Sequence, residues 1–130
     1  MKAKKILLGI GSGLMTSTLL VLVFQLFQWT YPQRMDGYFI TRPITECIHP
    51  VFIGCFILSG VALSYLKTNP FLIALGMILP LPIGYIAEVI VDPTSHNMFP
   101  FEVIGGWIPG FLIALCAIGL GRFIQKVNQN

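Results

Sequence analysis

Charged side chains are scarce in this sequence. Lys, Arg, Asp and Glu together supply 10% of the 130 residues, whereas a typical soluble domain contains about 25%. Apolar residues make up 55% of the chain, more than the roughly 45–50% of soluble domains. The composition therefore argues against an ordinary soluble domain and predicts an integral membrane protein. The expected partner is then the lipid bilayer.

Cysteine is also rare, and several familiar motifs are missing. The three cysteines, at positions 47, 55 and 116, form no Cys-x-x-Cys pair, which argues against a redox dithiol and a disulfide framework. The sequence contains no Gly-rich phosphate loop, no serine nucleophile elbow and no basic aromatic surface. We therefore expect neither P-loop nor serine-hydrolase chemistry, and no nucleic-acid partner.

Long apolar runs fill most of the chain. A helix needs about 20 apolar residues to cross about 30 Å of hydrocarbon, and four runs approach that length. They span residues 6–29, 47–66, 71–91 and 103–124. Because backbone groups in lipid must bond within their own segment, these runs predict an all-α membrane protein. We expect a single domain, residues 1–130, with four transmembrane helices in an up-down bundle.

The first run has some features of a cleaved signal peptide, since Lys2, Lys4 and Lys5 precede it. However, the run is longer than the 7–15 apolar residues typical of signal peptides, and no Ala-x-Ala-like site follows it. We expect this segment to be retained as a membrane helix.

Basic residues are divided unevenly between the two predicted membrane faces. Six lie beside the termini or in the second connector: Lys2, Lys4, Lys5, Lys67, Arg122 and Lys126. Only Arg34 and Arg42 lie on the other face. Because loops rich in Lys and Arg stay in the cytoplasm, we expect both termini to be cytoplasmic. The membrane would be the plasma membrane, which is the inner membrane of a bacterium.

The opposite face, periplasmic or extracellular, collects the acids and the imidazoles. Its members come from the first and third connectors and the adjoining helix ends: Asp36, Glu46, His49, Glu88, Asp92, His96 and Glu102. Glu46 and His49 are three residues apart, so one side of a helix carries both. Glu88 lies about one turn inside the apolar limit, where an ionisable group is expensive and indicates a functional site.

This collection of side chains predicts a site for a divalent metal. Imidazole and carboxylate ligands suit zinc, manganese or iron. The candidate ligands are His49, Glu88, Asp92 and His96. A metal with an open coordination position lowers the pKa of a bound water, and Glu46 and Glu102 are then the candidate catalytic acid and base.

An alternative interpretation of the same residues needs no cofactor. Arg42 can form an ion pair with Glu88, and Glu46 can interact with the positive dipole end of a helix. Gln25 and Gln28 are three apart on one helical face, so both amides can point into the bundle or meet lipid headgroups.

Small residues and prolines indicate where helices pack and bend. Gly9 and Gly13, like Gly106 and Gly110, have the small-xxx-small spacing that permits close helix contact. Pro80-x-Pro82 lies near the middle of the third run. Because proline lacks a backbone donor, this pair is expected to kink or open the helix.

Three functions are compatible with these patterns. The first is a binding or accessory membrane protein, whose outward acidic and histidine-bearing pocket holds a divalent cation, a polar headgroup or a partner subunit. The second is a metal-dependent, membrane-embedded enzyme of the hydrolase type. The third is a small transporter or proton pathway built from a homo-oligomer. The inner half of the apolar spans contains no ionisable residue, which disfavours a continuous relay. The sequence contains ligands without an identifiable substrate pocket, so the binding function is favoured.

Overall fold

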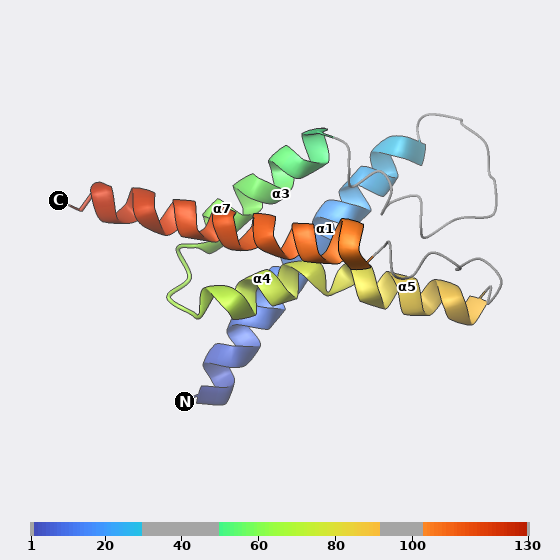
Figure 1. The fold of residues 1–130 in the computed structure, drawn as a ribbon, viewed down its shortest axis with the longest axis horizontal. Coiled ribbons are helices and arrows are strands. Elements are labelled where there is room, and N and C mark those ends of the chain that lie inside the picture. Colours follow the sequence, from blue (N-terminus) through green and yellow to red (C-terminus); the bar gives the residue numbers. More distant parts are fainter. Residues whose placement is uncertain (1, 30–49, 92–102, 130) are drawn as a thin grey trace.

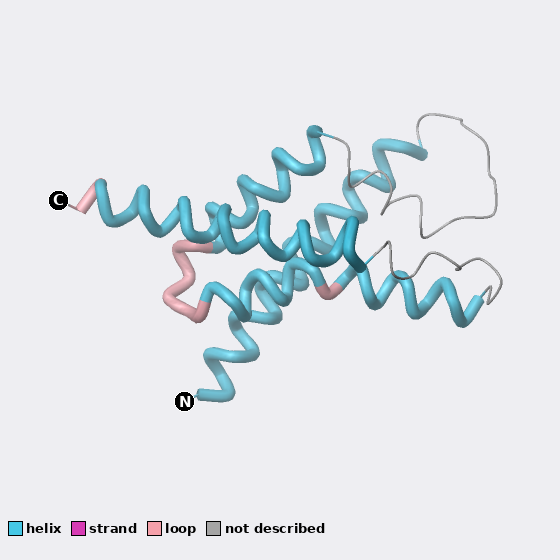
Figure 2. Tube along the Cα trace, viewed as in Figure 1, coloured by secondary structure: helices cyan, strands magenta, loops and turns pink. Residues whose placement is uncertain are grey.

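The computed structural model describes residues 2–29, 50–91 and 103–129, without the side chains of residues 2, 24–29, 85, 87–89, 91 and 103. The described chain is helical apart from short turns, and it contains no strand (Figures 1 and 2). Its elements are α1 (Lys2–Trp29), α3 (Pro50–Leu63), α4 (Pro70–Ile78), α5 (Pro80–Val91), the π-helical turn η1 (Val103–Trp107) and α7 (Ile108–Val127). The prediction of an all-α fold is confirmed for these residues.

The helix ends differ from the predicted spans by a few residues. Helix α1 begins at Lys2 rather than at residue 6, because lysine is a good helix former and the helix continues beyond its apolar part. Helix α3 ends at Leu63 rather than at residue 66. There the backbone N–H of Ser64 bonds the carbonyls of both Gly60 and Val61, at 3.0 and 3.2 Å, a tightening that is common at a helix end.

A capped turn leads from α3 into α4. The Asn69 side-chain oxygen Oδ1 accepts a hydrogen bond from the Phe71 backbone N–H at 2.9 Å, so it satisfies one of the free donors at the helix start. Pro70 occupies the first helical position, where its missing N–H has no cost.

The proline pair interrupts the third apolar run only briefly. Helix α4 ends at Ile78 and α5 begins at Pro80, with Leu79 between them in a helical conformation (φ −50°, ψ −34°). The N–H of Leu79 still bonds the Leu75 carbonyl at 3.1 Å, and the N–H of Ile83 bonds Leu79 at 3.2 Å. The break is therefore the short turn between α4 and α5 in Figure 2. The helix does not open widely there.

The described helices pack as two pairs, α1 with α4 and α3 with α7, which meet where α4 contacts α7. The buried apolar side chains come from α3, α4 and α7: Phe52, Phe56, Ile73, Ala74, Met77, Ile78, Ala114, Ala117 and Ile118. In Figure 1, α5 extends away from the other described helices. The core therefore lies around α4, the first part of the third apolar run.

Glycines allow the closest helix contacts. A Cβ atom added to Gly13 would lie 2.8 Å from the Met77 backbone nitrogen, and one added to Gly76 would lie 3.0 Å from the Ile10 carbonyl carbon. The backbones of α1 and α4 therefore meet without intervening side chains. The predicted Gly9 and Gly13 contact surface is confirmed, and its partner is α4. Of the second predicted pair, Gly110 packs against Ile78, whereas no described atom lies within 4 Å of a Cβ on Gly106.

Within the described part of the chain, two helical segments are long and apolar enough to cross a membrane: Ala3–Val23, with 21 residues, and Ile104–Val127, with 24. Two other apolar segments are shorter: α3, Pro50–Leu63, and the stretch Pro70–Gly84, which comprises α4 and the start of α5. Figure 1 shows the start of α1, the turn between α3 and α4 and the end of α7 on the same side of the molecule. The end of α5 lies on the other side.

Candidate functional site

The acidic and histidine-bearing site predicted from the sequence falls outside the described part of the chain. This applies to the whole residue for Arg42, Glu46, His49, Asp92, His96 and Glu102. Glu88 belongs to α5 and Gln25 and Gln28 belong to α1, but their side chains are outside the description. The structure therefore leaves the metal ligands, the acid–base pair and the ion pair as predictions.

Two of these residues adjoin described helix ends in the sequence. His49 directly precedes α3, and Asp92 directly follows α5 in the sequence. Figure 1 shows the start of α3 and the end of α5 well apart. Among the described residues, no group of three or more His, Cys, Asp and Glu side chains is placed to hold a metal.

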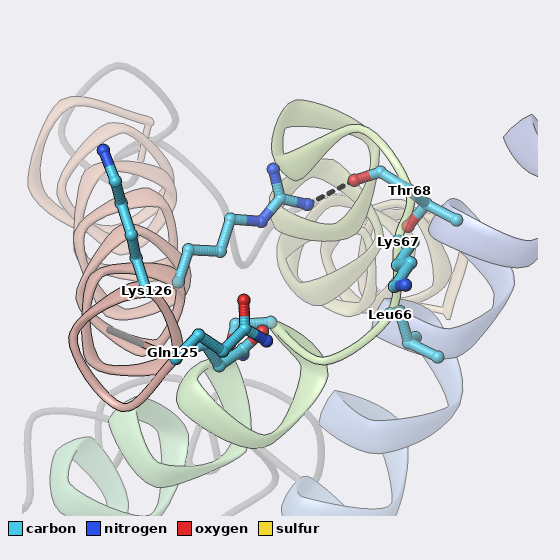
Figure 3. Close-up of a pocket in the computed structure, with 8 residues that line it drawn as sticks. Leu66, Lys67, Thr68, Gln125 and Lys126 are labelled. Atoms are coloured by element: carbon cyan, nitrogen blue, oxygen red, sulfur yellow. Dashed lines mark hydrogen bonds between the residues drawn. The ribbon is translucent and has the colours of Figure 1, made fainter.

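The described residues contain a different polar site, a pocket between the α3–α4 turn and the last part of α7. It has a volume of 470 Å³. It is lined by Ser64, Leu66, Lys67, Thr68, Arg122, Gln125, Lys126 and Gln129. Figure 3 shows the turn with Leu66, Lys67 and Thr68 on one side and α7 with Gln125 and Lys126 on the other. We call it the basic pocket.

Helix periodicity and the helix dipole explain the α7 side of the basic pocket. Arg122, Gln125, Lys126 and Gln129 recur at intervals of three and four residues, so they share one face of the helix. Basic side chains near a helix C-terminus interact favourably with the partial negative charge there. Lys67 adds a third positive charge from the turn, and none of the eight described lining residues is acidic.

Hydrogen bonds tie the two sides together. A guanidinium N–H of Arg122, at Nη2, donates to the backbone carbonyl of Thr68, drawn as a dashed line in Figure 3. The Gln125 amide nitrogen Nε2 donates to the Ser64 hydroxyl at 2.7 Å, and that hydroxyl donates to the Val61 carbonyl at 2.6 Å. These bonds hold the last part of α7 against the end of α3.

Gly121 makes this approach sterically feasible. A Cβ atom on Gly121 would lie 2.8 Å from the Ser64 Cβ and 2.9 Å from the Val61 carbonyl oxygen. Real Cβ atoms essentially never come so close to such atoms, and a larger residue would push α7 away from α3. The glycine therefore determines how closely the two sides of the basic pocket meet.

Thr68 forms the inner end of the turn. It is only 8% exposed, and its hydroxyl has no hydrogen-bond partner among the described residues. A Cβ atom on Gly9 of α1 would lie 3.6 Å from this hydroxyl oxygen. The Thr68 side chain thus packs towards α1, while its carbonyl receives Arg122.

The polar groups of the basic pocket suit the binding of an anion. The pocket's described polar groups are three cations, two amides and two hydroxyls, and cationic and N–H donors favour an anion. Sequence reasoning placed Lys67, Arg122 and Lys126 on one membrane face but did not predict that they share a pocket. The i, i+4 spacing of Arg122 and Lys126 was the available signal, whereas nothing local linked them to Lys67.

Comparison with known proteins adds no relative from which a function can be transferred. The chain matches no protein-family model, no curated protein and no solved structure.

Proposed function

We propose that this protein is a small polytopic membrane protein that acts as a binding or accessory subunit. Four membrane-spanning helices would form an up-down bundle in the plasma membrane. The cation, headgroup or partner subunit would bind at the outward acidic and histidine-bearing face.

The observation that carries the membrane part is the exposure of large apolar side chains on every long element. Leu7 of α1 is 73% exposed, Leu58 of α3 is 69% exposed and Phe123 of α7 is 64% exposed. In the most apolar windows of Ala3–Val23 and Ile104–Val127, only 17% and 22% of the residues are buried. The central helix of a soluble protein would be mostly buried, since exposing a Leu or Phe to water costs about 1.5–3 kcal/mol. Hydrocarbon removes that cost.

Helix length supports four spans. Helices α4 and α5 together run from Pro70 to Val91, which at 1.5 Å per residue gives about 33 Å. That length matches the roughly 30 Å of hydrocarbon in a bilayer. Helix α3 has 14 residues as described, and the sequence predicts that its apolar segment begins earlier, at residue 47.

The distribution of charge supports cytoplasmic termini. The start of α1, the α3–α4 turn and the end of α7 lie on one side in Figure 1, and these segments carry Lys4, Lys5, Lys67, Arg122 and Lys126. Positive charge is retained on the cytoplasmic side. Labelling of Asn128→Cys by a membrane-impermeant thiol reagent in intact cells, with the native cysteines at positions 47, 55 and 116 replaced by serine, would contradict this orientation.

The cation-binding part of the proposal is tested by elemental analysis of the purified full-length protein. We expect less than one zinc, manganese or iron per chain to remain in His49→Ala and in His96→Ala, against a stoichiometric amount in the unmodified protein. Asp36→Ala is the matched control, because Asp36 is an acid of the same face outside the proposed ligand set.

The outcome decides between the functions. Metal that is stoichiometric and is lost in both histidine variants supports a cation site and brings the enzyme alternative forward. If the unmodified protein contains no metal, the cation proposal fails, and a headgroup or partner subunit becomes the proposed ligand.

A further inference from the structure

The basic pocket concentrates positive charge without a described counter-charge. Lys67 and Lys126 are exposed, Arg122 and Gln125 are partly buried, and no acid is among the described lining residues. Figure 3 shows Lys67 and Lys126 on opposite sides of the pocket. An anion between these sides would be attracted by both, and it would reduce the repulsion among the three cations.

We propose that the basic pocket binds a phosphate group, carried by an anionic lipid headgroup or by free phosphate. A guanidinium has five N–H donors in a planar fork that matches the oxygens of phosphate. The bond from Arg122 to the Thr68 carbonyl uses one of them, so it orients the guanidinium and leaves other donors for the ligand. The two lysines supply mobile point charges.

The size of the site agrees with this ligand. The basic pocket is an open hollow of about 470 Å³, which is large enough for a phosphate group to enter from the surface. The Gln125 amide is fixed by its bond to Ser64, so the wall of the pocket is already formed.

Apolar side chains beside the pocket favour a lipid as the source of the phosphate. Tyr65, in the turn, is 66% exposed, and Phe123, which follows Arg122 on α7, is 64% exposed. Acyl chains can pack on these side chains while the phosphate enters the basic pocket. In the orientation proposed above, this pocket lies at the cytoplasmic surface, where anionic lipids attract clustered Lys and Arg.

The test measures binding to purified full-length protein in a non-ionic detergent and in lipid nanodiscs. Inorganic phosphate is titrated in detergent, and nanodiscs of phosphatidylcholine alone are compared with nanodiscs that also contain phosphatidylglycerol. We expect Arg122→Gln to weaken binding at least about tenfold, as for the loss of a hydrogen bond to a charged group. Lys126→Gln, which keeps Arg122 in place, should weaken it about two- to fivefold.

Lys5→Gln is the matched control, because it removes the same charge from the same side of the molecule but lies outside the pocket. Binding of both probes that falls in the pocket variants alone supports a site for phosphate as such. Binding of phosphatidylglycerol without inorganic phosphate supports the lipid source. If Lys5→Gln weakens binding as much as Lys126→Gln, or if neither probe binds, the proposal is overturned.

The outcome of the phosphate-binding test is independent of the outcome of the metal test on the outer acidic and histidine-bearing face. Arg122→Gln loses its bond to Thr68, so its folding is checked by thermal unfolding, and Lys126→Gln remains informative if Arg122→Gln is unstable. The titration with inorganic phosphate needs no membrane and none of the outer acids and histidines. Its failure would therefore leave the membrane and cation proposals untouched.

Discussion

Single glycines determine how closely the helices of this protein approach one another. Gly13 and Gly76 bring the backbones of α1 and α4 together, and Gly121 brings α7 to the end of α3. Between apolar helices in lipid, close van der Waals packing replaces the hydrophobic effect as the source of association. The lack of a side chain at these positions therefore helps to determine which helices pack together.

Gly13→Ala tests this role at the scale of one residue. The added methyl group would meet the backbone of α4, at 2.8 Å from the Met77 nitrogen, and overpacking of this kind costs about 1–3 kcal/mol. We expect the variant to unfold at a lower temperature in detergent. In Gly11→Ala, a control on the same helix, no described atom lies within 4 Å of the new Cβ, so its stability should be unchanged or higher by up to about 1 kcal/mol. Equal stability of the two variants would contradict the close α1–α4 contact.

Serine hydroxyls within the apolar helices are satisfied locally. The hydroxyl of Ser17 donates to the Gly13 carbonyl at 2.9 Å, and that of Ser59 donates to the Cys55 carbonyl at 2.8 Å. Local bonding to a preceding carbonyl is an ordinary role for serine in a helix. These residues therefore give no support to a polar route through the bundle.

At the scale of the element, the contact face of a helix cannot be recognised from hydropathy alone, as α7 shows. The buried residues of α7 are Ala114, Ala117, Ile118 and Gly121, which follow the three- and four-residue spacing of one helical face. Exposed positions such as Leu112 and Leu120 are equally apolar. Three of the four buried residues, Ala114, Ala117 and Gly121, are small, which allows α3 to come close, whereas the Ile118 side chain fills the core.

The start of α4 offers a test of local capping. Asn69→Ala removes the oxygen that accepts from the Phe71 N–H, and loss of such a cap typically costs about 0.5–2 kcal/mol. We expect the midpoint of thermal unfolding to fall accordingly. Asn128→Ala, at the exposed end of α7, should change it little, because the capping bonds there come from the backbone N–H of residue 128, which alanine keeps. An unaffected Asn69→Ala would show that Pro70 alone sets the start of α4.

At the scale of the whole molecule, the exposed apolar side chains would contact lipid if the protein lies in a membrane and water if it does not. Leu58, within α3, and Tyr65, in the turn after it, are exposed to nearly the same degree, at 69% and 66%. In water, a charged residue would be tolerated at both positions. In a bilayer, only the position at the surface would tolerate it.

Lys substitutions at these two positions make the difference measurable. We expect Leu58→Lys to reduce the amount of protein recovered from membranes, because lysine near the centre of a membrane helix costs about 2.5–3.5 kcal/mol. Tyr65→Lys should insert normally, since it adds positive charge on the proposed cytoplasmic side. Normal recovery of both variants in the membrane fraction would count against α3 as a membrane span.

The helices and their approximate ends were predictable from the sequence alone. Apolar content and helix-forming propensity are properties of each segment by itself, so the runs at 6–29, 71–91 and 103–124 correspond closely to α1, to α4 with α5, and to η1 with α7. The sorting of basic residues to one side is likewise a property of position along the chain. The acidic and histidine-bearing site remains a prediction, since its residues lie outside the described side chains.

Only the tertiary structure decided which faces meet and that a basic pocket forms. Thr68 and Arg122 are 54 residues apart, and nothing near either one in the sequence indicates the other. They meet because Gly121 permits α7 to approach Ser64 at the end of α3. Apolar side chains surround most of the length of these helices, so hydropathy predicts that the helices form but not which faces pair. Pairing depends on steric fit between small residues that are distant in the sequence.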